Sequence, residues 1–143
     1  MMRPELPTLL SAVVVILALV VYILAFMRVG SMRGKHKIDA PATIGHPEFE
    51  RAYRVQMNTV EQLVIFLPLL WLATSYFHLD AFPYLPALLG FVWVIGRFLY
   101  MQGYLVEASK RSTGFLISAV ATVALLVLSI VGIVQVWMAL SAT

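Results

Sequence analysis

The sequence predicts an all-α membrane protein built as a bundle of four transmembrane helices. Of its 143 residues, 62% are hydrophobic and only 12% are charged, whereas soluble domains carry about 25% charged residues. The apolar residues form four long segments, and each is long enough to cross a hydrocarbon layer of about 30 Å. We therefore expect a single domain over residues 1–143, with spans at about 6–28, 48–77, 82–108 and 113–139.

The first span rests on an uncharged run from Leu9 to Met27. Signal peptides also place a basic residue ahead of an apolar run, but this run is long for one and no small-residue cleavage site follows it. We expect a retained helix. The next stretch, 28–47, is basic and rich in glycine and proline, which predicts a loop.

The second helix is expected from Glu48 to Phe77, with polar lower turns and an apolar upper part. Pro68 is tolerated inside it because neighbouring helices can shield the freed carbonyl. The elements that follow are a turn at 78–83, a third helix at 84–108, a loop at 107–114 and a fourth span at 115–137.

The basic residues are distributed unevenly between the two ends of this bundle. One end is expected to hold Arg28, Arg33, Lys35, Lys37, Arg51, Arg54, Lys110 and Arg111, and the other end only Arg3. Because short cytoplasmic loops carry the excess of Lys and Arg, we expect the basic loops to face the cytoplasm.

Two polar stripes converge on this basic end. On a helical wheel, Arg54, Asn58 and Glu61 fall within about 60° of one another, with Arg51 close to the same line. Arg97, Tyr100, Tyr104 and Arg111 form a second stripe of similar width. Polar groups at that depth normally face a cavity or a partner, which predicts a site for a small zwitterionic or anionic ligand.

Each stripe also has a simpler interpretation. Arg54 and Glu61 could form an ion pair, and Arg97 could extend to the interface. The two tyrosines could be interfacial aromatic residues, and Arg111 a topology signal. The occurrence of both stripes at one depth favours the ligand site. Gln56 points about 200° away from Arg54 on the same wheel, so only a neighbouring subunit could bring it to the site.

Other kinds of site find less support. The chain has no cysteine, so a disulfide framework and a thiolate metal site are both excluded. His36, His46 and His78 are expected in loops without ligand spacing, and we predict no metal. The formal charge of +3 is small and lies beside membrane spans, which argues against nucleic acid.

Two segments, PEFERAYRVQMNTVEQLVIFLPLLWLA and GRFLYMQGY, closely resemble the MAPEG family, the membrane-associated proteins in eicosanoid and glutathione metabolism. The resemblance is nearest to its leukotriene C4 synthase branch and its type 2 and 3 microsomal glutathione transferase branches. It implies a four-helix subunit, a homotrimer, and glutathione bound between adjacent subunits near the cytosolic face.

The resemblance also implies roles for individual residues. The glutathione-binding residues it implies are Arg54, Asn58, Glu61, Arg97, Tyr100 and Tyr104 from one subunit and Arg33 and Gln56 from its neighbour. Arg111 falls at the position of the family's catalytic arginine. Such an arginine would favour the glutathione thiolate, which then attacks a hydrophobic electrophile or lipid arriving from the membrane.

Two departures bear on the reaction. Gln62 stands where the leukotriene C4 synthase branch has a tyrosine, and Gly34 replaces a second arginine beside Arg33. Both count more against the leukotriene-type epoxide reaction than against glutathione binding.

The leading hypothesis is a glutathione transferase, with glutathione peroxidase activity as a further possibility. The alternatives are a non-enzymatic lipid-binding scaffold and a small transporter. A transporter would hold a charge near the midplane of its path, yet the first and fourth spans hold none. The compact chain, without a retention signal, favours a bacterial inner membrane.

Overall fold

Five helices make up the computed structural model, which describes residues 5–77, 79 and 81–142. They are α1 (Leu6–His36), α2 (Pro47–Tyr76), α3 (Leu85–Val106), the short 3₁₀ helix η1 (Ala108–Arg111) and α4 (Ser112–Ser141). The four α-helices are long and apolar enough to cross a membrane, and the described residues contain no strand. The predicted all-α, four-span fold is confirmed.

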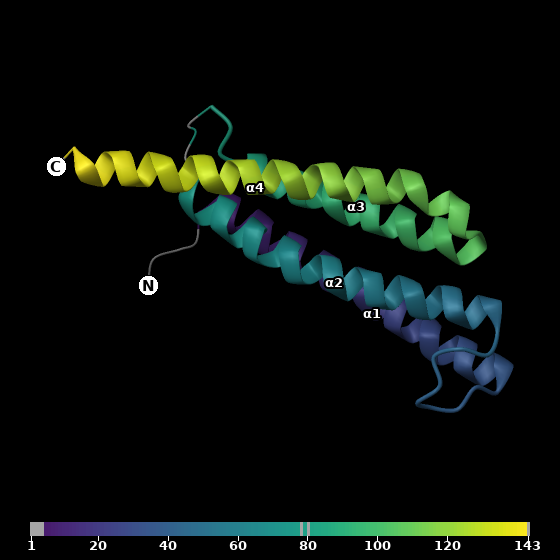
Figure 1. The fold of residues 1–143 in the computed structure, drawn as a ribbon. Helices are drawn as coiled ribbons and strands as arrows, with labels where there is room; N and C mark the ends of the chain where they lie inside the picture. Colours follow the sequence, from purple (N-terminus) through teal and green to yellow (C-terminus); the bar gives the residue numbers. More distant parts are fainter. Residues whose placement is uncertain (1–4, 78, 80, 143) are drawn as a thin grey trace.

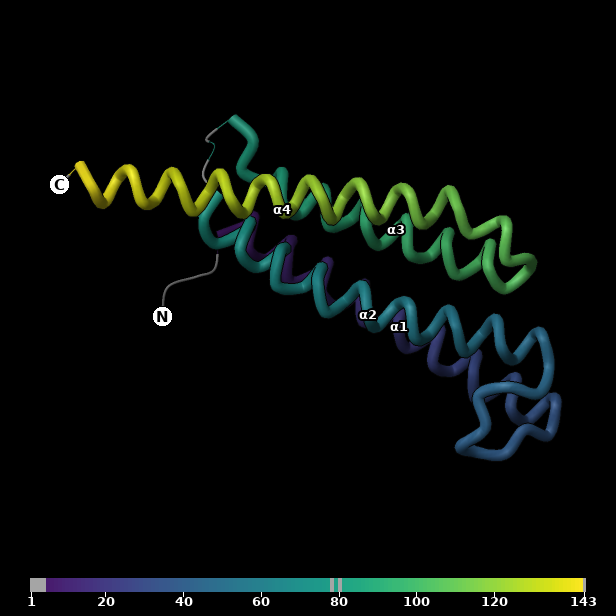
Figure 2. The backbone as a smooth tube through the Cα atoms, viewed as in Figure 1, coloured from purple at the N-terminus to yellow at the C-terminus, as the bar shows by residue number. Residues whose placement is uncertain are grey.

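The helices pack as two pairs, α1 beside α2 and α3 beside α4, and α2 also packs against α4 (Figure 1). The pairs diverge toward the end that carries the loop 37–46 and η1, as the backbone trace shows (Figure 2). We call this the basic end of the bundle. α1 begins and α4 ends at the other end (Figure 1).

Large apolar side chains hold the bundle together. Phe66 of α2 stacks on Trp93 of α3, with ring centroids 3.9 Å apart and the planes 6° from parallel. Both side chains are fully buried, and the cluster around them includes Val14, Leu70 and Leu125. The outer faces carry exposed apolar side chains, as expected of helices that contact lipid.

At the basic end, α3 and α4 lie in backbone contact. A Cβ atom added to Gly114 would collide with the backbone nitrogen of Tyr100, and one added to Gly96 would lie 2.7 Å from the backbone nitrogen of Ser118. Small residues permit this close approach between helices in membranes. The contact sets the depth at which α3 presents its polar residues.

The boundaries differ from the prediction in two places. α1 continues to His36 instead of ending near residue 28, so the predicted loop shortens to 37–46. Gly30 and Gly34 do not break it, since an exposed helical glycine costs only about 1 kcal/mol, and basic residues in the last turn favour the helix C-terminus. α3 ends at Val106, and η1 occupies part of the expected loop 107–114.

Three residues from the segments discussed above lie outside the described part of the chain. They are Arg3, the one basic residue expected at the other end, and His78 and Asp80 of the predicted turn 78–83.

Candidate functional site

A continuous line of polar contacts joins α2 to α3 at the basic end. Asn58 donates from Nδ2 to Glu61 Oε2 at 3.4 Å, and its Oδ1 accepts from Arg97 Nη2 at 3.1 Å. Arg97 Nη2 also donates to Thr59 Oγ1 at 3.0 Å. The two predicted polar stripes therefore meet between the helices.

Arg97 is the most deeply placed charge of this line. Its side chain is fully buried, and its guanidinium carbon lies 4.0 Å from the centroid of the Tyr100 ring. Within the described structure its Nε and Nη1 have no hydrogen-bond partner. The interpretation in which Arg97 extends to the interface is therefore wrong. Unpaired buried N–H groups are costly, and a carboxylate that reached them would satisfy them.

The line continues along α3 to η1. The rings of Tyr100 and Tyr104 lie 5.6 Å apart, and Arg111 donates from Nη1 to the Tyr104 hydroxyl at 3.2 Å. The guanidinium carbon of Arg111 also lies 5.1 Å from the Tyr104 ring centroid. Both tyrosines are buried, so they are not interfacial aromatic residues, whereas Arg111 is exposed.

Arg111 joins this line by a different route from the one the helical wheel predicts. It lies in η1, after α3 has ended, and η1 folds back against α3. Gly103 makes room for this, because a Cβ atom there would collide with the carbonyl oxygen of Lys110. The position of Arg111 thus depends on a backbone contact that the wheel does not describe.

A cavity of about 640 Å³ lies beside the line. Its lining includes Arg51, Arg54, Tyr104 and Glu107, together with residues of the loop before α2. Its size is in the usual range for small-molecule sites, about 300–1,000 Å³. Arg54 is exposed, and among the described residues it forms no ion pair with Glu61. The alternative interpretation of these two residues as an ion pair is therefore wrong.

Arg51 holds this region together. Its Nε donates to the backbone carbonyl of Leu105 at 3.2 Å, which ties the base of α2 to the last turn of α3. The bond keeps the cavity wall in place where the helix pairs diverge.

Arg33 and Gln56 lie apart from these residues within one chain. Arg33 donates from Nη1 to the carbonyl of Asp39 at 3.3 Å and lies over the Phe49 ring at 4.7 Å. Among the described residues, neither takes part in the polar contacts between Glu61 and Arg111, and neither lines the 640 Å³ cavity. A single chain therefore brings together all of the predicted site residues except these two, which we expected from a neighbouring subunit.

Sequence reasoning missed Thr59. Its hydroxyl donates to the Val55 carbonyl at 2.7 Å and accepts the bond from Arg97, and the side chain is fully buried. Its only signal in the sequence is a polar residue beside Asn58, and such residues often bond only to their own helix.

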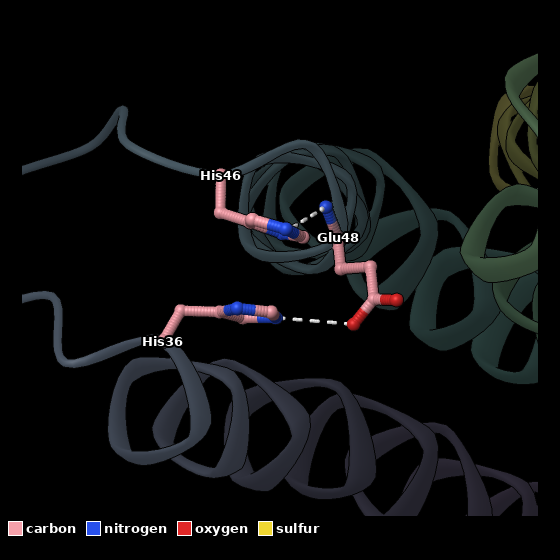
Figure 3. Close-up of side chains that lie close together, drawn as sticks. All are labelled: His36, His46 and Glu48. Atoms are coloured by element: carbon pink, nitrogen blue, oxygen red, sulfur yellow. Dashed lines mark hydrogen bonds and ion pairs between the residues drawn. The ribbon is translucent and has the colours of Figure 1, made fainter.

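A second polar cluster joins α1 to α2, and it corrects the expectation that His36 and His46 lie in loops without ligand spacing. His36 is the last residue of α1, and its ring stacks on that of His46 with centroids 3.6 Å apart. His36 Nε2 lies 3.0 Å from Glu48 Oε2, and His46 Nδ1 accepts from the backbone nitrogen of Glu48 at 3.2 Å (Figure 3).

The spacing of this cluster would fit a metal ion, since the potential ligand atoms of all three residues lie within 4.8 Å of one another. However, the Lys35 ammonium pairs with the same Glu48 oxygen, and His46 Nδ1 is occupied in capping α2. Three of the potential ligand atoms, His36 Nε2, His46 Nδ1 and Glu48 Oε2, are therefore already engaged by protein partners. We interpret the cluster as a link between α1 and α2.

The fold and these contacts define an integral membrane protein with a polar site between its helices. The MAPEG family model matches residues 10–131, and the chain belongs to the MAPEG family. It is 42% identical over 107 residues to human microsomal glutathione S-transferase 2, covering 75% of this chain and 70% of that protein.

Two further relatives show the range of the similarity. Guinea-pig leukotriene C4 synthase is 37% identical over 124 residues, covering 87% of this chain and 80% of that protein. An uncharacterised protein of Synechocystis is 42% identical over 116 residues, with 81% and 82% covered.

Proposed function

We propose that this protein is a membrane-bound glutathione transferase that activates the glutathione thiol for attack on a lipophilic electrophile. The observation that carries the proposal is the line of side chains that runs from Glu61 through the buried Arg97 to the exposed Arg111, beside a cavity of about 640 Å³. The names of the relatives, which include a glutathione S-transferase and leukotriene C4 synthase, support this reaction class.

The residues of the line suit the functional groups of glutathione. Arg97 offers two buried nitrogens, Nε and Nη1, that have no partner in the described part of the chain. A guanidinium binds a carboxylate through strong, charge-assisted hydrogen bonds. Glu61 is exposed and can pair with the ligand's ammonium group. Arg54 lines the cavity without a described partner and can bind the second carboxylate. These contacts hold the tripeptide in one orientation, so that its sulfur lies toward Arg111.

Arg111 then acts on the thiol. A free thiol has a pKa of about 8.5, so only a few per cent is thiolate at neutral pH. A guanidinium about 4 Å away stabilises the anion by about 1 kcal/mol in water and about 4 kcal/mol near a protein surface, which lowers the thiol pKa by about one to three units. The proton leaves to solvent, because arginine stays protonated.

The thiolate attacks the electrophilic carbon, a C–S bond forms, and the leaving group departs with its electron pair. We extend the proposal to hydroperoxides, where the thiolate attacks the peroxide oxygen and releases an alcohol. A second glutathione then reduces the resulting sulfenic acid and gives glutathione disulfide and water.

The proposal includes a homotrimer in which a neighbouring subunit supplies Arg33 and Gln56. On the helical wheel Gln56 points about 200° away from Arg54, and this supports its contribution to a neighbouring subunit's site. Native mass spectrometry of the detergent-solubilised protein tests the homotrimer, because it measures the number of chains in each complex. The basic loops support a cytoplasmic site, and we propose a bacterial inner membrane as its location.

Substitution of the proposed catalytic arginine tests the function. The assay measures the rate at which glutathione is conjugated to a chromophoric aryl halide in detergent, for the wild-type protein and for Arg111→Ala. We expect the rate to fall at least about tenfold, the effect of one pKa unit on the thiolate fraction. Lys110→Ala is the matched control, because Lys110 is an exposed cation of the same turn and pairs with Glu107 at 3.8 Å.

Equal losses in both variants would refute the role of Arg111. If glutathione binds tightly but neither aryl halides, epoxides nor hydroperoxides are turned over, the protein is a non-enzymatic lipid-binding scaffold instead.

A further inference from the structure

A second cavity at the basic end lies between α1, α2 and α3 and has a volume of about 240 Å³. It is lined by three cationic side chains, Arg28, Lys35 and Arg51, and by one carboxylate, that of Glu48. The cations therefore outnumber the carboxylates lining this cavity, and an anion is favoured there.

The cations keep donor groups available. Arg28 is exposed, and no hydrogen bond or ion pair joins it to another described residue. Arg51 uses only its Nε for the Leu105 carbonyl, which leaves both of its terminal nitrogens. Lys35 shares Glu48 with His36, so Glu48 is already partly neutralised.

An apolar groove of about 360 Å³ continues from this cavity and shares Arg28, Leu105 and Val106 with it. Its other lining residues include Leu24, one turn before Arg28 on α1, and Phe98 and Met101 of α3. Leu24 and Phe98 lie farther from the basic end than Arg28 and Leu105 do. The groove therefore runs from the cationic cavity into the membrane-spanning part of the bundle.

We propose that this combined site binds one anionic phospholipid. Arg28, Lys35 and Arg51 hold the phosphate of the headgroup, and an acyl chain lies along the groove past Leu24 and Phe98. Basic pockets between transmembrane helices at the cytoplasmic side recognise such headgroups, and the apolar groove gives the acyl chain a matching surface. Arg51 also lines the 640 Å³ cavity, so the lipid adjoins the proposed glutathione site without forming part of it.

Lipid binding to the purified protein tests this proposal without any measurement of activity. The full chain in an uncharged detergent is titrated with phosphatidylglycerol or phosphatidylcholine carrying the same acyl chains, and bound lipid is counted by native mass spectrometry. We expect one phosphatidylglycerol per chain, bound at least fivefold more tightly than phosphatidylcholine. Arg28→Gln should weaken phosphatidylglycerol binding about fivefold, which corresponds to about 1 kcal/mol for each cation near an anionic lipid surface.

Two controls make the result specific. Lys37→Asn removes a charge from the same end of the bundle, at an exposed residue with φ 52° whose conformation asparagine tolerates, and should change the affinity less than twofold. Phe98→Gln should weaken the binding of both lipids equally, because Phe98 contacts the acyl chain in the proposed complex and not the phosphate. Circular dichroism and size-exclusion elution verify that each variant folds.

Equal affinity for the two lipids would overturn the proposal, and so would equal losses in Arg28→Gln and Lys37→Asn. Displacement of the lipid by water-soluble glycerophosphoglycerol at the same concentration would also overturn it, since the site would then bind a headgroup alone.

Discussion

Gly103→Ala is expected to lower the proposed transferase activity without replacing any side chain of the line that runs from Glu61 to Arg111. The added methyl group would collide with the carbonyl oxygen of Lys110 and lie 2.9 Å from its carbonyl carbon. Both atoms belong to the backbone, so no side chain can rotate away. η1 must move by about 1 Å to restore an ordinary contact distance.

Arg111 moves with η1. Its bond to the Tyr104 hydroxyl is already 3.2 Å long, and a displacement of about 1 Å would break it. Misplacement of a catalytic group by about 1 Å can cost roughly 100-fold in rate. We therefore expect kcat for aryl halide conjugation to fall between tenfold and 100-fold, with the KM for glutathione changing less than threefold.

The pH profile separates misplacement of Arg111 from general damage. If the guanidinium is held farther from the sulfur, the thiol pKa rises toward its value in free glutathione, and the rate should increase with pH over a higher range than in the wild type. The thiolate absorbance of bound glutathione, titrated against pH, measures the same shift directly.

Gly30→Ala is the matched control, because nothing lies within 4 Å of a Cβ atom built there. It should leave the rate and the pH profile unchanged. Wild-type kcat and an unshifted pH profile in folded Gly103→Ala would refute the argument that η1 sets the position of Arg111.

Two further substitutions test contacts within one helix and between helices. Thr59→Val leaves a buried N–H of Arg97 without its partner, which costs about 1–3 kcal/mol; a lower melting temperature and weaker glutathione binding should follow, and an unchanged binding curve would contradict it. His46→Ala removes the cap of α2 and should cost about 1 kcal/mol, measured by thermal unfolding. His46→Asn should restore most of that stability, and a failure to do so would show that stacking on His36 matters more than capping.

The faces of the helices could be predicted from the sequence because they depend only on helical periodicity. Asn58 and Glu61 are three positions apart and Arg97 and Tyr100 likewise, so each pair shares a face whatever the rest of the fold does. The contact between the two polar stripes, one on α2 and one on α3, could also be predicted. The charged ends of the spans place both stripes at the same depth in the membrane.

The route to Arg111 could not be predicted in this way, because it depends on tertiary contacts. The wheel assumes one helix through residue 111, whereas α3 ends at Val106 and η1 turns back over Gly103. Arg111 does lie on the side that the wheel predicts, but this agreement does not arise from helical periodicity. Likewise, His36 and His46 are ten positions apart in sequence and meet only because α1 extends to His36 and the following loop returns the chain to its side.

The difference in burial between Arg97 and Arg111 suggests how binding and chemistry are divided under the proposed function. The fold has already removed water from Arg97, so a carboxylate that reaches it gains a charge-assisted bond without a further desolvation cost for the arginine. Arg111 stays exposed and can approach a sulfur at the mouth of the site. Changes around Arg97, such as Thr59→Val, should therefore act mainly on glutathione affinity, and changes around Arg111, such as Gly103→Ala, mainly on turnover.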